Sequence, residues 1–120
     1  MSIRPTDSAR DLLAADRANT ETRLAALERD FNGIVDSSAS GVSDDEHDPE
    51  GGTTAFERQH VAAMIGQAED RLADIAKALD RLDAGSYGQC ERCGRAIAAE
   101  RLAARPAAST CIRCAAAGRR

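Results

Sequence analysis

The sequence predicts a mainly α-helical protein, in which a long antiparallel helical hairpin (a coiled coil) precedes a small C-terminal four-cysteine finger. Two long segments repeat apolar residues in alternating steps of four and three, the pattern of helices that pack along one face. A polar, acidic stretch separates these segments, and two pairs of cysteines follow the second one. With only two Phe, one Tyr and no Trp in 120 residues, the composition favours slender helical packing over a wide globular core.

The first helix is expected over residues 8–35. Ser8 begins a sequence that resembles a capping box, which would start the helix there. A stripe follows in steps of four and three, and two polar residues weaken its first half. The stripe consists of Leu13, Arg17, Thr20, Leu24, Leu27, Phe31 and Ile34.

The second helix is expected over residues 54–84, and its apolar stripe is uninterrupted. Gly85 follows the last stripe residue closely and predicts the end of the helix, because glycine favours the position just after a helix. The stripe consists of Val61, Ile65, Ala68, Leu72, Ile75, Leu79 and Leu82.

The two stripes match in length, so we expect the helices to pack against each other within one chain, as a monomer. Leu82 would then lie near Leu13, and Val61 near Ile34. The alternative is that each helix pairs with a second copy of the chain.

Residues 1–84 would thus form the hairpin, and residues 36–53 the loop at its tip. This loop is rich in Ser, Gly and Asp and carries six acidic side chains and no basic one. Crowded carboxylates repel one another and often mark a function, although a solvated loop that aids solubility is the alternative. The candidate partner-binding residues here are Asp44, Asp45, Glu46, Asp48 and Glu50.

The four cysteines form two Cys-x2-Cys pairs, Cys90 with Cys93 and Cys111 with Cys114, separated by seventeen residues. This spacing is typical of a tetrahedral zinc site with four thiolate ligands. We therefore expect residues 85–120 to form a finger around one structural zinc ion. Two disulfides or a redox-active pair are the alternatives.

Neither an apolar leader nor an apolar run long enough to span a membrane is found, so we expect a cytoplasmic protein without membrane contact. Thiols stay reduced in that compartment, which favours metal ligands over disulfides. A four-cysteine site has no open coordination position, and no set of catalytic side chains accompanies it. We therefore do not expect an enzyme. His47 and His60 are interpreted as solvated residues.

The finger resembles the zinc finger of the DksA/TraR family, whose pattern is roughly YGxCxxCGxxIxxxRLxAxPxAxxCxxC. The resemblance covers about residues 85–114. Its matching positions are Tyr87, Gly88, Cys90, Cys93, Gly94, Ile97, Arg101, Leu102, Ala104, Pro106, Ala108, Cys111 and Cys114.

The resemblance extends more loosely to the hairpin. The family has a long helical hairpin with the tip motif Asp-x-x-Asp-x-Ala, and Asp45 and Asp48 match its aspartates while Glu50 replaces its alanine. The tip aspartates also lie about two residues farther from the finger than in the best-known member. The segment around them resembles an actinobacterial branch of the family.

The resemblance implies a transcription regulator that binds RNA polymerase through its secondary channel, with the acidic tip near the active site. Some members act together with ppGpp, which is therefore a candidate partner. An acidic rim of the polymerase would meet the basic finger, where seven arginines outnumber two acids over residues 85–120. The candidate contact residues are Arg92, Arg95, Arg105 and Arg113.

Two other functions remain open at this point. The finger arginines would suit nucleic-acid phosphates, although the chain carries a net charge of −4 and no direct sequence-specific DNA binding is expected. Oxidation of the cysteines would eject zinc and make the finger a thiol redox sensor.

Overall fold

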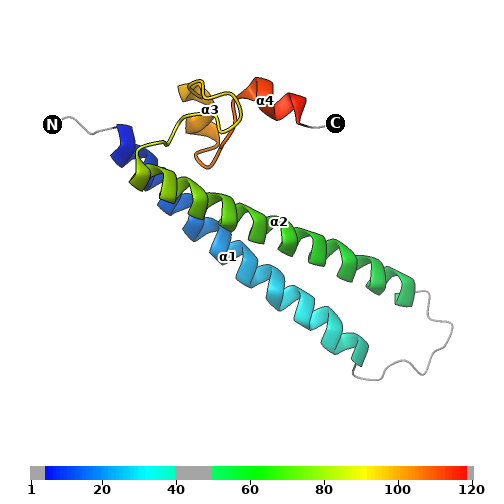
Figure 1. Cartoon of the computed structure of the whole chain (residues 1–120). Helices are drawn as coiled ribbons and strands as arrows, with labels where there is room; N and C mark the ends of the chain where they lie inside the picture. Colours follow the sequence, from blue (N-terminus) through cyan, green and yellow to red (C-terminus); the bar gives the residue numbers. More distant parts are fainter. Residues whose placement is uncertain (1–4, 40–49, 119–120) are drawn as a thin grey trace. The chain divides into compact units, whose positions relative to one another are not determined.

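A computed structural model describes residues 5–39 and 50–118 of the chain (Figure 1). Over these ranges the secondary structure is helical, with one isolated antiparallel bridge between Gln89 and Ala96 and no strand. No described helix is long and apolar enough to cross a membrane. The helices are α1 (Pro5–Ala39), α2 (Glu50–Ala84), α3 (Ala99–Ala104) and α4 (Ile112–Ala117).

Both long helices extend beyond the limits expected from the sequence. Helix α1 begins at Pro5, so Ser8 lies inside the helix and the prediction that it caps the first turn is wrong. Proline suits the first helical position, where its missing N–H would have no partner in any case. The expected loop over residues 36–53 is also too long, because α1 continues to Ala39 and α2 begins at Glu50. Once a helix exists, each added residue gains a hydrogen bond at low cost, which lets polar residues prolong it.

Helix α2 ends where the sequence predicted, by a hydrogen-bonded turn around Gly85. Gly85 has a φ of 81°, a left-handed conformation that glycine adopts without strain. The N–H of Ser86 donates to the carbonyl of Arg81 at 2.8 Å, and the N–H of Gly85 donates to that of Leu82 at 3.2 Å. This is the Schellman pattern, which satisfies carbonyls at the helix end.

The chain divides into two compact units, of which the first combines Met1–Asn19 with Arg71–Arg120. Leu13 and Ile75 are fully buried in its core. Leu82 belongs to the same cluster, so the expected proximity of Leu82 to Leu13 is confirmed. The cluster also includes Ala9 and Ala78, small residues outside the stripes that let the helices approach closely.

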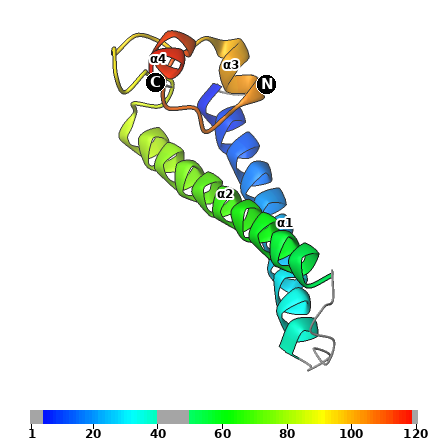
Figure 2. The ribbon, with the colours of Figure 1, turned by 90° about the vertical axis from the view of Figure 1, so that its right-hand side faces the viewer.

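Two ion pairs show that the helices of this unit run antiparallel (Figures 1 and 2). Arg10 Nη2 lies 2.9 Å from Asp83 Oδ1. Farther along α1, Asp16 accepts two hydrogen bonds from Arg71, at 2.8 Å from Nε to Oδ1 and at 3.0 Å from Nη2 to Oδ2. Arg10 pairs with Asp83, whereas Asp16, later in α1, pairs with Arg71, earlier in α2. The two segments therefore run in opposite directions.

The second unit, Thr20–Asp70, contains the remaining parts of α1 and α2. Thr20, Leu27 and Ala68 are buried in it, as the two stripes predict. Phe56, by contrast, leaves 73% of its surface exposed. The expected contact between Val61 and Ile34 stays a prediction, as do the monomeric state and a domain boundary between residues 84 and 85.

Candidate metal centre

The first pair of cysteines lies on a tight turn closed by backbone hydrogen bonds. The N–H of Cys90 donates to the carbonyl of Arg95 at 2.8 Å, and the N–H of Gly94 donates back to the carbonyl of Cys90 at 2.9 Å. Gly94 has a φ of 77°, which a residue with a side chain rarely adopts. The Cys-x2-Cys-Gly sequence therefore folds into a turn that presents both thiols on one side.

The second pair lies at the start of α4. Cys111 immediately precedes the helix and Cys114 lies in its first turn, so the helical rise sets their separation. The N–H of Ala115 donates to the carbonyl of Cys111 at 2.9 Å. The two pairs are also joined by Arg92, whose Nη1 donates to the carbonyl of Cys114 at 3.3 Å.

The four thiols converge on one point. Their Sγ atoms all lie within 4.8 Å of one another, and those of Cys93 and Cys111 are 3.8 Å apart. A tetrahedral zinc ion with Zn–S bonds of about 2.3 Å needs sulfurs about 3.8 Å apart, so the donor set fits one zinc ion. Cys90 is buried while Cys93 is exposed, which puts the site at the edge of the finger.

This part of the chain, residues 85–117, matches the family model of the prokaryotic dksA/traR C4-type zinc finger. The fold matches the structure of transcription factor DksA2 from Pseudomonas aeruginosa with a TM-score of 0.76 and 26% sequence identity. That match covers 94% of this chain and 81% of the other. Residues 85–117 therefore form a zinc finger of the dksA/traR type, and the fold of the chain is similar to that of DksA2.

Two curated relatives share parts of the chain. The uncharacterized protein YteA of Bacillus subtilis (strain 168) is 36% identical over 66 residues, which are 55% of this chain and 28% of that protein. An uncharacterized protein of Aquifex aeolicus (strain VF5) is 46% identical over 44 residues, 37% of this chain and 30% of that protein. The chain thus spans less than a third of the length of either curated relative. The actinobacterial branch stays a prediction.

The family match and the thiol geometry together confirm the prediction of one zinc ion. Without metal, the four thiols differ in pKa, because some accept hydrogen bonds as thiolates and others donate them. The backbone N–H of Cys111 stabilises the Cys90 thiolate and is the largest cause that lowers the Cys90 pKa to about 6. The Cys114 thiol donates to Cys111 and Cys90, which raises its pKa to about 12. A zinc ion replaces these shared protons and holds all four sulfurs as thiolates.

Tyr87 connects the finger to the two long helices. Its ring packs against the cluster around Leu13 and Ile75. Its hydroxyl donates a 2.7 Å hydrogen bond to the carbonyl of Pro106. Burial raises the pKa of Tyr87, and the positive charge of Arg81 opposes that rise.

Arg81 is a residue that the sequence analysis missed. It lies in the last turn of α2, with only 13% of its side chain exposed. Its Nη2 donates to the carbonyl of Gln89 at 2.7 Å, and its Nη1 lies 3.9 Å from Glu91 Oε1. Among the described residues Nη1 has no hydrogen-bond partner. The only sequence signal was an arginine next to the stripe residue Leu82, four residues before Gly85.

The four arginines that were expected to contact a partner lie on the surface of the finger. Arg92 is exposed and donates a hydrogen bond to the carbonyl of Cys114, and Arg95, Arg105 and Arg113 are exposed on the finger.

His60 is exposed on α2, in agreement with a solvated residue. Glu50 begins α2. The remaining expected tip residues lie outside the described residues, together with His47; they are Asp44, Asp45, Glu46 and Asp48.

Proposed function

We propose that this protein is a non-enzymatic transcription regulator that binds RNA polymerase directly. The observation that carries the proposal is the likeness to transcription factor DksA2 over 94% of the chain, joined to a DksA/TraR finger. The hairpin would enter the secondary channel of the polymerase, and the acidic tip would approach the active site.

The physical properties of the helices suit this role. Each long helix has 35 residues, and at 1.5 Å per residue a helix of that length extends about 52 Å. Two paired helices are narrow enough for a channel that excludes a globular domain. Asp45 and Asp48 would supply the oxygen ligands that magnesium prefers, or would pair with cations beside it.

The finger would have a structural and a binding role. A zinc ion with four thiolates has no free coordination position, so it would hold the finger together without taking part in a reaction. We assign Arg92, Arg95, Arg105 and Arg113 to contact with an acidic surface of the polymerase, because charge complementarity speeds and orients association. In this proposal the protein acts in the cytoplasm as a monomer, with ppGpp as a candidate second ligand.

Binding of the zinc-loaded protein to core RNA polymerase tests the proposal, with a transcript-cleavage factor as the competitor. We expect saturable binding that the competitor abolishes. Asp45→Asn with Asp48→Asn should retain binding but lose the effect on transcription in vitro. Glu69→Gln with Asp70→Asn is the matched control, because it removes two exposed acids from the body of α2.

The outcomes separate the parts of the proposal. Absence of binding at micromolar protein would reject the polymerase as partner. Binding that the competitor does not disturb would reject the secondary channel. An unchanged transcription profile for the tip variant would show that Asp45 and Asp48 are not the effector groups.

A second candidate function is a response to oxidants, and the exposure of Cys93 favours it. Its Sγ lies 3.8 Å from that of Cys111, close enough for the two to join after a small movement. Hydrogen peroxide would take two electrons from the two thiolates, which form a disulfide, while two protons from solvent complete two water molecules. Zinc would then leave. Failure of peroxide to release zinc to a chelating dye would reject this function.

A further inference from the structure

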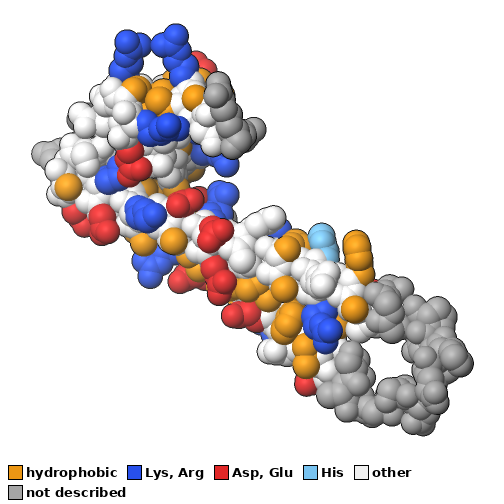
Figure 3. Space-filling view, turned by 45° about the vertical axis from the view of Figure 1, so that its right-hand side comes forward, with side chains coloured by type: hydrophobic (Ala, Val, Ile, Leu, Met, Phe, Trp, Pro, Cys, Tyr) orange, Lys and Arg blue, Asp and Glu red, His pale blue; other side chains and the backbone are white. Residues whose placement is uncertain are grey.

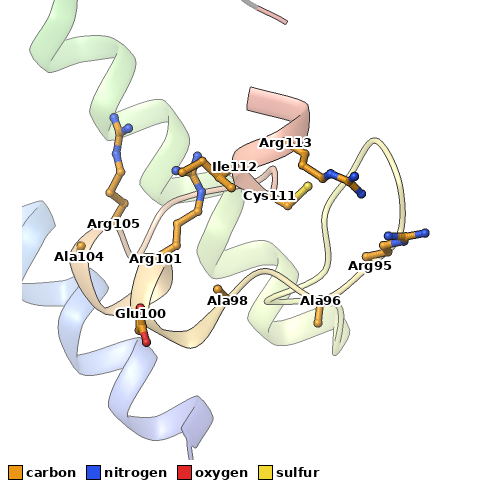
Figure 4. Close-up of a pocket in the computed structure, with 10 residues that line it drawn as sticks. All are labelled: Arg95, Ala96, Ala98, Glu100, Arg101, Ala104, Arg105, Cys111, Ile112 and Arg113. Atoms are coloured by element: carbon orange, nitrogen blue, oxygen red, sulfur yellow. The ribbon is translucent and has the colours of Figure 1, made fainter. Parts of the chain in front are cut away.

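The finger contains an open pocket between the loop after the first cysteine pair, α3 and the start of α4 (Figure 4). Its volume is about 550 Å³. Its lining includes four arginines and one acid, Glu100. We call this site the arginine pocket, and all of its lining lies within the first compact unit.

The four arginine side chains line the pocket from more than one side. In Figure 4, Arg101 lies on α3 and Arg105 directly follows that helix, while Arg95 and Arg113 lie on the opposite side. Arg101 is held in place, since its Nε donates to the carbonyl of Thr110 at 2.9 Å. The other three arginines are exposed.

The surface between these cations is apolar. Ile112 leaves 70% of its surface exposed at the start of α4, although isoleucine is among the residues most often buried. Ala96, Ala98 and Ala104 add further apolar lining. The space-filling view shows blue side chains around a small orange area at the finger (Figure 3). An apolar surface edged by cations suits a ligand that has both carboxylates and an apolar side chain.

We propose that the arginine pocket binds an acidic segment of a partner protein. An apolar side chain of that segment would cover Ile112, and flanking carboxylates would pair with Arg95, Arg105 and Arg113. Guanidinium groups bind carboxylates with two parallel hydrogen bonds, which gives such pairs geometric specificity. The inference rests on the proposed function, which already gives Arg95, Arg105 and Arg113 an acidic partner surface, and it adds the ligand class that the pocket would bind. The peptide test contains no polymerase, so its failure is distinguishable from a failure of polymerase binding.

The lining favours a protein segment over a nucleic acid. Single-stranded nucleic acids bind to aromatic platforms along a continuous cationic groove. The arginine pocket has no aromatic lining residue, and Glu100 interrupts its positive charge.

The test uses the full zinc-loaded chain and a fluorescein-labelled peptide in which leucines stand among aspartates and glutamates. Fluorescence anisotropy should show saturable binding. The same peptide with serine in place of leucine should bind several-fold more weakly, and so should one with asparagine and glutamine in place of the acids. A single-stranded oligonucleotide is the competitor.

Variants then locate the peptide. Ile112→Ser should weaken binding about fivefold, because it removes part of one apolar contact. Arg95→Gln with Arg113→Gln should weaken it about tenfold, as expected for two partly exposed ion pairs. The matched controls are Phe56→Ser for the first variant and Arg29→Gln with Arg58→Gln for the second. These residues are also exposed and lie outside the pocket, so the controls should leave the affinity unchanged. Zinc content and helical circular dichroism verify that each variant is folded.

Three results would overturn the proposal. One is the absence of saturable peptide binding. Another is equal affinity for the leucine and serine peptides, or for the parent protein and Ile112→Ser. The third is tighter binding of the oligonucleotide through Arg95 and Arg113, which would make the pocket a nucleic-acid site.

Discussion

Arg81 Nη2 donates a 2.7 Å hydrogen bond to the carbonyl of Gln89, the residue immediately before the first zinc ligand. Gln89 also forms the bridge with Ala96 that closes the first cysteine turn. The last turn of α2 is therefore bonded directly to the backbone that positions Cys90. This contact makes the orientation of the turn depend on a side chain of the helix.

Replacing Arg81 with methionine should weaken the attachment of the finger while zinc remains bound. Methionine retains much of the apolar length but cannot donate to Gln89, and a hydrogen bond from a charged group contributes about 1.5–3 kcal/mol. Part of that loss is offset, because Nη1 has no hydrogen-bond partner in the described part of the chain. We expect the free energy of unfolding in urea to fall by about 1–2 kcal/mol.

Arg58→Met is the control for this variant, because Arg58 is exposed on α2 in the other unit. Its stability should stay within about 0.5 kcal/mol of the parent protein. If both variants unfold at the same urea concentration as the parent, the Arg81–Gln89 bond contributes nothing to stability.

Tyr87 should ionise above the ordinary pKa of tyrosine. Burial raises its pKa from 10.0, so the folded state favours the neutral phenol. Its contribution to stability is present below pH 10 and is lost as the pH rises through the folded pKa. Since the chain has one tyrosine and no tryptophan, the ultraviolet absorbance of tyrosinate reports on Tyr87 alone.

Tyr87→Phe separates the hydrogen bond from the titration. Loss of the bond to Pro106 should cost about 1 kcal/mol at neutral pH. The stability of this variant should then decline less than that of the parent as the pH rises above 10. An absorbance midpoint at or below 10 in the folded protein would contradict the burial argument.

The repeated features of the fold were predictable from the sequence. The stripes indicated the helices, and the match in their lengths placed Leu13 beside Leu82. Gly85 marked the end of α2 because a left-handed residue favours glycine. The cysteine spacing predicted the zinc ligands, because two Cys-x2-Cys pairs at this separation are typical of a four-thiolate zinc site.

Features that depend on tertiary neighbours were not predictable. Arg17 belongs to the first stripe by spacing but is exposed, whereas Ala9 and Ala78 are buried outside both stripes. Nothing local in the sequence marks Arg81 as the link to the finger. The lining of the arginine pocket likewise combines Arg95, from the loop after the first cysteine pair, with Arg113 of α4, and only the folded chain shows the apolar surface between its arginines.

Leu13 and Leu12 offer a matched test of the core of the first unit. Leu13 is fully buried beside Ile75, while the adjacent Leu12 leaves 42% of its surface exposed. Leu13→Ala should lower the free energy of unfolding by about 2–5 kcal/mol, because it removes buried surface and leaves a cavity. Leu12→Ala should cost less than about 1 kcal/mol in the same urea titration. Equal losses would show that α1 does not pack through Leu13.

Zinc retention should fail on acidification, with a midpoint set by the thiolates. Without metal the pKa of Cys90 is already lowered from 9.0 to about 6, so its thiolate stabilises the fold above pH 9 and this stabilisation is lost as the pH falls through about 6. Protons compete with zinc for all four sulfurs, so zinc release should increase as the pH falls. A chelating dye that is titrated from neutral to acidic pH measures the release.

Cys90→Ser should lose zinc already at neutral pH, because a serine hydroxyl does not ionise there and three thiolates remain. Ser109→Ala is the control: Ser109 accepts a 2.9 Å bond from the N–H of Glu91 through its backbone carbonyl, which alanine retains. This control should release zinc at the same pH as the parent protein. Full zinc occupancy in Cys90→Ser at neutral pH would show that the metal does not need Cys90, and the four-cysteine assignment would be wrong.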